Sequence, residues 1–239
     1  LQFPAIYATF LDVEGNPSSF YGVDGLPIVS THNIDGSWNN ETSAHKKPRV
    51  KADSDGAYVI WNDFRTDYSG DIYIQKITHE NNGVWENASS HPSDGIPVSE
   101  EYGEQSNSRL TLDGNGGVYV VWENGEELQI DIKIKHLDSD GNSTFDTDGL
   151  SVCANEKDQI SPIVRKDGNG GAFSVWKDYR EGSAGIYAQH INVLGNVSMS
   201  ENGSKLFYGI DYNGYLYNNE DPLQLTPKSL YLGNEQTLL

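Results

Sequence analysis

One ten-residue phrase occurs twice in the sequence, and this repetition constrains the fold more than any other feature. Residues 113–122 read DGNGGVYVVW and residues 167–176 read DGNGGAFSVW. Aligning the chain with itself extends the two copies into three units, at 48–100, 108–155 and 162–207. The period is about 60 residues, which is typical of repeat architectures. Because one such unit cannot bury its own faces, stacked neighbours must cover them, and we predict a fold of repeated sheets.

Each unit is predicted to hold four β-strands. In the first unit they lie around PRVKA, AYVIW, IYIQKI and GIPVS, which begin at residues 48, 57, 72 and 95. These runs are rich in β-branched and aromatic residues and are bounded by Gly, Asn and Asp, as strands are. No stretch shows helical periodicity with capping residues. We therefore predict an all-β chain of four-stranded antiparallel units.

The two ends of the chain carry incomplete units. Residues 5–31 match the second half of a unit, and residues 225–239 match the first half weakly and without its tryptophan. Repeated four-stranded units are typical of β-propellers, so we expect one propeller domain over 1–239 with about four blades. One blade would be closed from the two half-units. Two alternatives stay open: the chain is part of a larger propeller, or its half-units pair between copies, with Ile6 to Leu11 as the intermolecular strand.

Composition limits the partners and the compartment. The chain has 35 Asp and Glu against 16 Lys and Arg, a formal net charge of -19. This field repels nucleic-acid phosphates and anionic lipids, so we expect neither as a partner. No apolar run approaches the roughly 20 residues of a membrane span, so we expect a soluble chain without membrane insertion. The one cysteine, Cys153, excludes an intrachain disulfide and is expected to be a small buried residue.

A longer shared pattern, P-x-v-x-x-D-G-x-G-G-a-x-v-x-W-x-D-x-R followed by i-Y-a-Q and D-G-x-x-v, resembles the blade repeats of secreted and cell-surface bacterial β-propeller proteins. The resemblance covers roughly residues 5–207 and implies a bacterial protein that is secreted or displayed at the cell surface. It does not name a ligand. The pattern is carried by Trp61, Asp63, Arg65, Tyr73 and Gln75, and by Trp176, Asp178, Arg180, Tyr187 and Gln189. The middle unit departs from it, since Trp122 is followed by Glu123, Asn124 and Gly125.

The Trp-x-Asp-x-Arg segments are predicted to be structural. An Asp and an Arg at this spacing share one face of a strand, which favours a bidentate ion pair or a clasp onto the neighbouring blade. The same pair occurs in two units, whereas a catalytic group is normally unique. The residues assigned to this structural role are Trp61, Trp122, Trp176, Asp63, Arg65, Asp178 and Arg180.

The acidic turns raise the question of calcium. The simplest interpretation of D-G-N-G-G is a tight turn, in which Asp accepts backbone N–H groups and glycine supplies positive φ. A calcium site is the alternative, because hard oxygen donors alternate at Asp53 and Asp55 and again at Asp138 and Asp140. Calcium is therefore the one cofactor that the sequence leaves open.

Aromatic residues outside the repeat are the candidate ligand-binding residues, since flat rings next to amides suit stacking on sugars or gripping a peptide. They are Tyr212, Tyr215, Tyr217, Trp38 and Trp85.

A scaffold of near-identical units favours a non-catalytic extracellular binding or assembly module with a protein or glycan partner. We therefore expect that the chain is not an enzyme. The alternatives are a lectin-like glycan-binding propeller and a sialidase-like glycoside hydrolase, although the Asp-box pattern S-x-D-x-G-x-T-W is not in the sequence. Self-association through the half-units is a further expectation.

Overall fold

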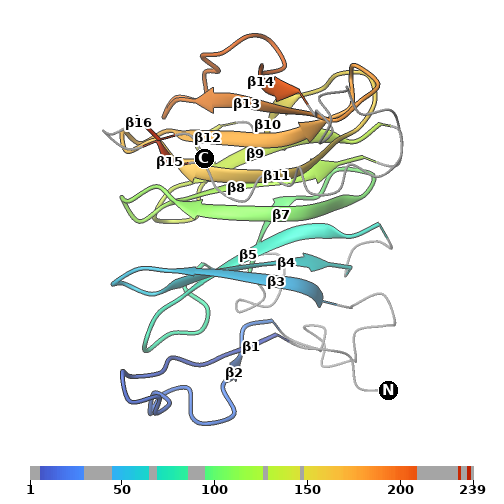
Figure 1. The fold of residues 1–239 in the computed structure, drawn as a ribbon. Helices are drawn as coiled ribbons and strands as arrows, with labels where there is room; N and C mark the ends of the chain where they lie inside the picture. Colours follow the sequence, from blue (N-terminus) through green and yellow to red (C-terminus); the bar gives the residue numbers. More distant parts are fainter. Residues whose placement is uncertain are drawn as a thin grey trace. The chain divides into compact units, whose positions relative to one another are not determined.

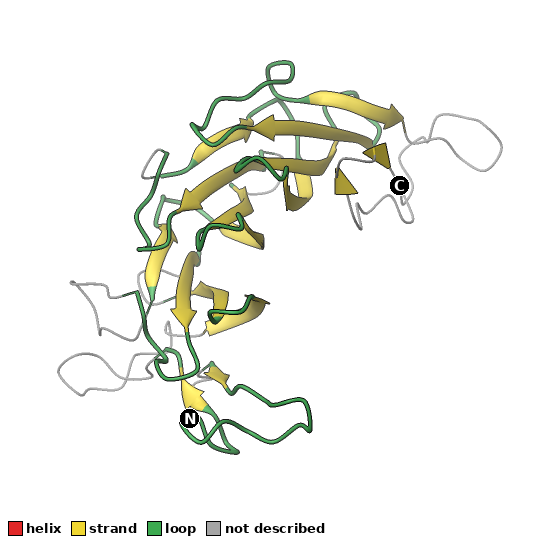
Figure 2. Cartoon of the chain, turned by 90° about the vertical axis from the view of Figure 1, so that its left-hand side faces the viewer, coloured by secondary structure: helices red, strands yellow, loops and turns green. Residues whose placement is uncertain are grey.

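The computed structural model divides the chain into two compact units, Leu1–Tyr102 (unit 1) and Gly103–Leu239 (unit 2). Strands, turns and loops make up everything that it describes, as Figure 2 shows. The described part contains no helix that could cross a membrane. The described residues are 6–29, 45–64, 69–85, 95–125, 129–145, 148–208, 231–232 and 236–237.

Unit 1 holds one four-stranded antiparallel sheet and one two-stranded sheet (Figure 1). The four-stranded sheet, called sheet I, has the order β3-β4-β5-β6. Its strands are β3 (His45–Ala52), β4 (Ala57–Asp63), β5 (Asp71–Ile77) and β6 (Ile96–Ser99). The two-stranded sheet, called the half-sheet, pairs β1 (Tyr7–Ala8) with β2 (Leu26–Pro27).

Unit 2 holds two further four-stranded antiparallel sheets, II and III, with each strand paired to the next along the chain. Sheet II consists of β7 (Gln105–Leu112), β8 (Val118–Asn124), β9 (Asp131–Leu137) and β10 (Leu150–Cys153). Sheet III consists of β11 (Gln159–Lys166), β12 (Ala172–Asp178), β13 (Gly185–Ile191) and β14 (Ser204–Tyr208). The predicted all-β fold with one four-stranded sheet for each repeat is therefore confirmed.

The fourth blade that was predicted from the two half-units is not formed by the described strands. At the C-terminus, β15 (Tyr231–Leu232) and β16 (Gln236–Thr237) pair only with each other, and the half-sheet is likewise a separate sheet. Each of these strands is two residues long. Such short strands offer few backbone groups for joining a larger sheet. A closed propeller stays a prediction.

In each complete sheet, a buried tryptophan packs against a glycine. In sheet III, Trp176 is fully buried and lies against Gly203, just before β14. Gly203 has φ +85°, and a Cβ built on it would lie only 2.3 Å from Cη2 of Trp176. Both facts require glycine, because other residues rarely adopt this backbone conformation and none has room here. The same contact joins Gly95 to Trp61 and Gly149 to Trp122.

The D-G-N-G-G phrase forms the turn between the first and second strands of a sheet. In sheet III, Oδ1 of Asp167 accepts the backbone N–H groups of Asn169 at 2.7 Å and Gly171 at 2.9 Å. In sheet II, Oδ1 of Asp113 accepts the backbone N–H groups of Asn115 and Gly117 in the same way. The repeated phrase is therefore a turn whose aspartate satisfies backbone donors.

In each of these turns, the second carboxylate oxygen of the aspartate contacts a histidine on the third strand of the sheet. We call this contact the tie. In sheet III, Oδ2 of Asp167 lies 2.8 Å from Nε2 of His190, whose Nδ1 lies 2.6 Å from the Ser198 hydroxyl. Sheet II has the same arrangement. Oδ2 of Asp113 lies 3.0 Å from Nε2 of His136, whose Nδ1 lies 2.8 Å from the Thr144 hydroxyl. An Asp–His–hydroxyl arrangement could suggest nucleophilic catalysis. Because it recurs at equivalent positions, we interpret it as a tie between the turn and the strand.

This tie predicts acid lability. Burial alone would raise the pKa of Asp167, but hydrogen bonds from His190, Asn169 and Gly171 outweigh it and lower the pKa below its ordinary 3.8. A lowered folded-state pKa contributes stability that is present above about pH 4 and is lost as the pH falls through the folded pKa. Thermal melts between neutral pH and about pH 2.5 should therefore show a steeper loss for the wild type than for Asp167→Asn.

The matched control for the acid melts is Asp140→Asn, which changes an exposed carboxylate in a neighbouring turn. It should follow the wild-type curve. Equal acid slopes for the wild type and Asp167→Asn would contradict the stabilising role of the tie.

Sheets II and III pack against each other within unit 2. Their shared core includes Tyr119 and Ile134 from sheet II and Val164 and Trp176 from sheet III. The Tyr119 hydroxyl donates to the backbone oxygen of Gly170 at 2.6 Å, which fixes the D-G-N-G-G turn of one sheet on the other. The first strand of sheet III, β11, lies beside β7 and β8 (Figure 1). The repeats thus cover one another's faces.

Candidate functional site

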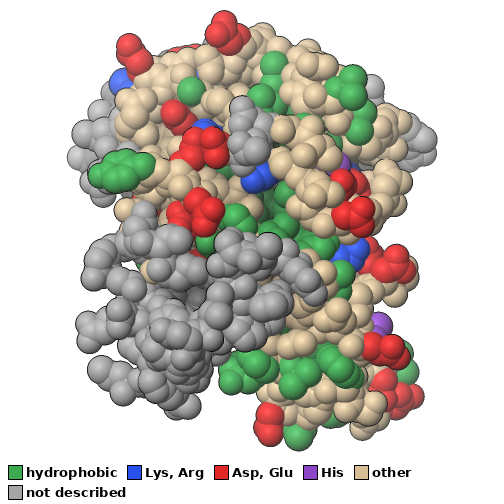
Figure 3. Space-filling view, turned by 180° about the vertical axis from the view of Figure 1, so that it is seen from behind, with side chains coloured by type: hydrophobic (Ala, Val, Ile, Leu, Met, Phe, Trp, Pro, Cys, Tyr) green, Lys and Arg blue, Asp and Glu red, His purple; other side chains and the backbone are tan. Residues whose placement is uncertain are grey.

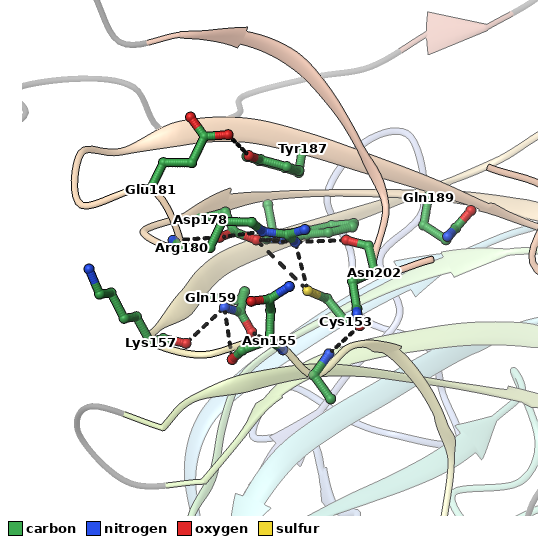
Figure 4. A network of polar contacts seen from close by, with 12 residues as sticks. Cys153, Asn155, Lys157, Gln159, Asp178, Arg180, Glu181, Tyr187, Gln189 and Asn202 are labelled. Atoms are coloured by element: carbon green, nitrogen blue, oxygen red, sulfur yellow. Dashed lines mark hydrogen bonds and ion pairs between the residues drawn. The ribbon is translucent and has the colours of Figure 1, made fainter. Parts of the chain in front are cut away.

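A dense polar cluster joins sheets II and III where β12 ends (Figure 4). Arg180 makes a bidentate ion pair with Asp178, with Nε to Oδ1 at 3.0 Å and Nη2 to Oδ2 at 2.6 Å. Trp176 donates its indole N–H to the same Oδ2 at 2.9 Å. Asp178 is 1% exposed and accepts hydrogen bonds from both Arg180 and Trp176. We call these three residues the clasp.

The clasp reaches across to the last strand of sheet II. Nη2 of Arg180 lies 3.0 Å from Sγ of Cys153 and 2.7 Å from the backbone oxygen of Asn202 (Figure 4). Cys153 is a buried free thiol, as the sequence predicted, and burial raises its pKa to about 12. Such a thiol stays protonated at neutral pH and is a poor nucleophile. The cluster therefore joins the two sheets and offers no reactive cysteine.

The tryptophan–aspartate part of the clasp recurs in sheet I, and sheet II carries a different residue in place of the aspartate. In sheet I, Trp61 donates to Asp63 at 2.7 Å, and the predicted partner Arg65 lies outside the described residues. In sheet II, the indole N–H of Trp122 donates to Oδ1 of Asn124, at 3.4 Å. Sheet II therefore departs from the pattern where sheets I and III carry an aspartate.

Asp131, the first residue of β9, lies where sheet II departs from the pattern. It pairs in register with Asn124, whereas the matching pairs are Asp71 with Asp63 and Gly185 with Asp178. Its Oδ1 is fully buried, and no described residue donates a hydrogen bond to it. Burial raises the pKa of Asp131, and the charge of Lys133 only partly offsets this. The pKa of Asp131 is therefore shifted in the direction opposite to those of the turn aspartates Asp113 and Asp167.

A second carboxylate is placed beside Asp131 by backbone contacts. Oδ1 of Asp158 accepts the backbone N–H of Ile130, the residue before Asp131, at 3.3 Å. The backbone N–H of Gln159 donates to the oxygen of Ile130 at 2.7 Å. These contacts hold the start of β11 against the start of β9. Asp131 and Asp158 are thus two partly buried carboxyl groups on adjoining sheets, the kind of groups that acid–base chemistry uses.

The predicted calcium residues are used as turn residues. Oδ1 of Asp53 accepts the N–H groups of Asp55 and Gly56, at 2.9 and 3.1 Å. Oδ1 of Asp138 accepts those of Asp140 and Asn142, at 3.0 and 2.9 Å. Within the described ranges, no three His, Cys, Asp or Glu side chains form a group that could hold a metal ion. Calcium binding stays a prediction, which a calorimetric Ca²⁺ titration would test.

One of the predicted ligand-binding aromatics, Trp85, is buried in the structure. Trp85 is 3% exposed and packs edge-on against Tyr58, with 5.5 Å between ring centroids. Gln75 holds it in place by bonding both its backbone N–H and its backbone oxygen, at 3.0 and 3.1 Å. Trp85 is therefore a core residue, because its loop folds back onto β5. The other candidates, Trp38, Tyr212, Tyr215 and Tyr217, lie outside the described residues.

Asp131 and Asp158 are the residues that the sequence interpretation missed. The available signal was the departure of the middle unit from Trp-x-Asp-x-Arg, which removes an aspartate opposite the start of the third strand. Only the packing of Asp131 in sheet II shows that one of its carboxyl oxygens is buried and accepts no hydrogen bond from the described residues.

No family model matches the chain, and no curated protein matches its sequence. Among solved structures, the chain is similar to an endo-arabinase from Bacteroides thetaiotaomicron, with a TM-score of 0.41 and 13% identity over 74% of this chain and 71% of that one. It is also similar to an endo-1,4-beta-xylanase from the same organism, with a TM-score of 0.39 and 12% identity over 72% of this chain and 58% of that one. A third similar structure is an alpha-L-arabinofuranosidase from Lactobacillus brevis, with a TM-score of 0.38 and 9% identity over 84% of this chain and 69% of that one.

These likenesses contradict one part of the sequence interpretation. The structures named above are glycoside-cleaving enzymes, whereas we predicted a non-catalytic binding or assembly module and a chain that is not an enzyme. That prediction rested on the recurrence of side chains between units. Side chains that recur between the units are the ones that stabilise the sheets. They give no information about side chains that are present in one unit only.

Proposed function

We propose that this chain is a glycan-processing enzyme that hydrolyses glycosidic bonds, with Asp131 as its acid. The observation that carries the proposal is the environment of Asp131. Its Oδ1 is buried without a donor among the described residues, and burial raises its pKa. A carboxyl group raised in this way can hold a proton at a pH where ordinary carboxylates are ionised.

The reaction assigns one role to each of the two carboxyl groups. Asp131 gives its proton to the glycosidic oxygen as the bond from that oxygen to the anomeric carbon breaks. A water molecule forms the new bond to the anomeric carbon, and Asp158 accepts the proton that this water loses. The two products are a shortened glycan and a new reducing end.

Charge favours a neutral glycan as the substrate. The net charge of -19 repels acidic polysaccharides. The arginines of unit 2 are also committed to internal contacts: Arg180 to Asp178, Arg109 to the backbone oxygen of Ser108 at 2.9 Å, and Arg165 to that of Val164 at 2.9 Å. A sialidase-like site built on arginines therefore has no support in unit 2. Neutral arabinan, xylan and mannan are the substrates to test.

The three complete sheets are proposed to be blades of a β-propeller. In support, sheets II and III share a core and contact each other through their first strands, as blades around an axis do. We also propose that the protein acts outside the cell, where polymeric glycans are met. Cell fractionation followed by immunoblotting would test the location.

The test of the proposed function is release of reducing ends from arabinan, xylan and mannan. The wild type should release them from at least one polymer. Asp131→Asn should lower kcat by about a hundredfold or more, because loss of a general acid costs this much. The matched control, Asp140→Asn, changes an exposed turn aspartate of the same sheet and should keep wild-type activity.

Thermal melts accompany the assay, since Asp131→Asn adds no charge to this partly buried position and should not lower the melting temperature. The proposal fails if the wild type cleaves none of the polymers, or if Asp131→Asn keeps its activity.

A further inference from the structure

The tip of each D-G-N-G-G turn carries an asparagine followed by a glycine. Asn115 precedes Gly116 in sheet II, Asn169 precedes Gly170 in sheet III, and both asparagines are exposed. The side-chain carbonyl carbon of an asparagine is open to attack by the backbone nitrogen of the next residue. Glycine permits this approach because it has no side chain in the way. The two turns therefore present a reactive pair of groups to water.

The other Asn-Gly pairs of the chain are held by hydrogen bonds. The sequence contains six such pairs, of which Asn213-Gly214 lies outside the described residues. In three pairs a hydrogen bond fixes the asparagine side chain: from Asn82 to the Pro27 oxygen at 2.7 Å, from Trp122 to Asn124 at 3.4 Å, and from the Ala154 N–H to Asn202 at 3.0 Å. These side chains must break a bond before they can rotate and react.

The space around the glycine separates the pairs further. Gly203, which follows Asn202, is buried, and a Cβ built on it would lie 2.3 Å from Trp176. The nearest atom to a Cβ built on Gly170 belongs to Val193, at 3.6 Å, which is an ordinary van der Waals distance. The attack requires the glycine nitrogen to turn towards the asparagine side chain. Gly170 has room for this movement, and Gly203 has not.

We propose that Asn115 and Asn169 are modification sites, at which the chain loses ammonia and takes up water. At Asn169, the nitrogen of Gly170 forms a bond to Cγ, the bond from Cγ to Nδ2 breaks, and ammonia leaves with the proton of the Gly170 N–H. Water then opens the resulting cyclic imide at one of its two carbonyl carbons, which gives aspartate or isoaspartate. Water is the only reactant besides the chain, and the carboxyl groups of the proposed function take no part.

The isoaspartate product is expected to disrupt the turn, because it places an extra backbone atom between residues 169 and 170. The N–H groups of Asn169 and Gly171 lie on either side of this atom, and both donate to Oδ1 of Asp167. Between them, the oxygen of Gly170 accepts the Tyr119 hydroxyl at 2.6 Å. A longer backbone cannot keep all three bonds. The modification therefore loosens the tie and the join between sheets II and III.

The test compares the folded chain with the same chain unfolded in guanidinium chloride, both kept in mildly alkaline buffer. Peptide mapping by mass spectrometry follows deamidation at each pair. In the unfolded chain, Asn82, Asn115, Asn124, Asn169 and Asn202 should react at similar rates, because all five precede glycine. In the folded chain, Asn115 and Asn169 should react at least about tenfold faster than the other three, where a hydrogen bond must first be lost.

The stability of the product tests the structural step. In the Asn115→Gln variant, only Asn169 of the two turns reacts, because glutamine closes the corresponding ring far more slowly. The product adds a carboxylate to a chain of formal net charge -19, whose acidic side chains are visible in Figure 3, and ion exchange separates it from the unreacted chain. A product rich in isoaspartate at 169 should melt about 2–4 °C below the Asn169→Asp variant, the effect of about one lost hydrogen bond.

The Asn169→Asp variant is the matched control, because it has the same charge and an ordinary backbone. Three results would overturn the proposal. They are equal rates at the five sites of the folded chain, a preference for Asn115 and Asn169 that persists unchanged in guanidinium chloride, and an isoaspartate product that melts together with the Asn169→Asp variant.

Discussion

Asp178→Ala is expected to lower the free energy of unfolding by about 3–5 kcal/mol, the cost of leaving a buried charge without its partner. Asp178 is 1% exposed and the Arg180 side chain is 15% exposed, so solvent can replace the lost carboxylate only in part. The indole N–H of Trp176 loses its acceptor in the same variant. Urea denaturation with an unchanged m-value would measure the loss.

The control for the clasp is Glu181→Ala in the same loop. Glu181 pairs with Lys205 and accepts the Tyr187 hydroxyl, but its side chain is 48% exposed. An exposed pair is worth at most about 1 kcal/mol, so this variant should be nearly neutral. If both variants cost the same, the clasp does not stabilise the join between sheets II and III.

Gly203→Ala is expected to be the second most damaging substitution. The positive φ costs an L-residue about 1–2 kcal/mol, and forcing a methyl group against Trp176 adds about 1–3 kcal/mol of overpacking. The control is Gly168→Ala, because Gly168 has φ +83° but no atom within 4 Å of its would-be Cβ.

Gly168→Ala should therefore show the backbone cost alone, about 1–2 kcal/mol. The difference between the two unfolding free energies isolates the contact with the tryptophan ring. Equal losses would mean that the Trp176 ring moves aside at no cost and that the recurrent glycine answers only a backbone requirement.

The sheets could be predicted from sequence because their signals are local and repeated. The strand β12 follows directly from A-F-S-V-W after the D-G-N-G-G turn, and the same phrase gives β8. Trp85 could not be placed in this way. Its burial depends on Gln75, which captures both backbone groups of a residue in a loop outside the repeat.

The raised pKa of Asp131 was equally hidden in the sequence. Asp71 and Asp131 occupy the same position in D-I-Y-I-Q-K-I and D-I-K-I-K-H-L, so recurrence marks both as structural. The difference lies in the residue across the sheet, which is Asp63 in sheet I and Asn124 in sheet II. Recurrence therefore predicted the framework and misdirected the functional interpretation.

The central claim is that hydrogen bonds lower the pKa of the recurrent turn aspartates while burial raises the pKa of Asp131. Carboxyl ¹³C chemical shifts followed through a pH titration would test it directly in one sample. We predict that Asp131 titrates above the ordinary aspartate value of 3.8 and that Asp113 and Asp167 titrate below it. An Asp131 that titrates together with the turn aspartates, at or below 3.8, would contradict the account.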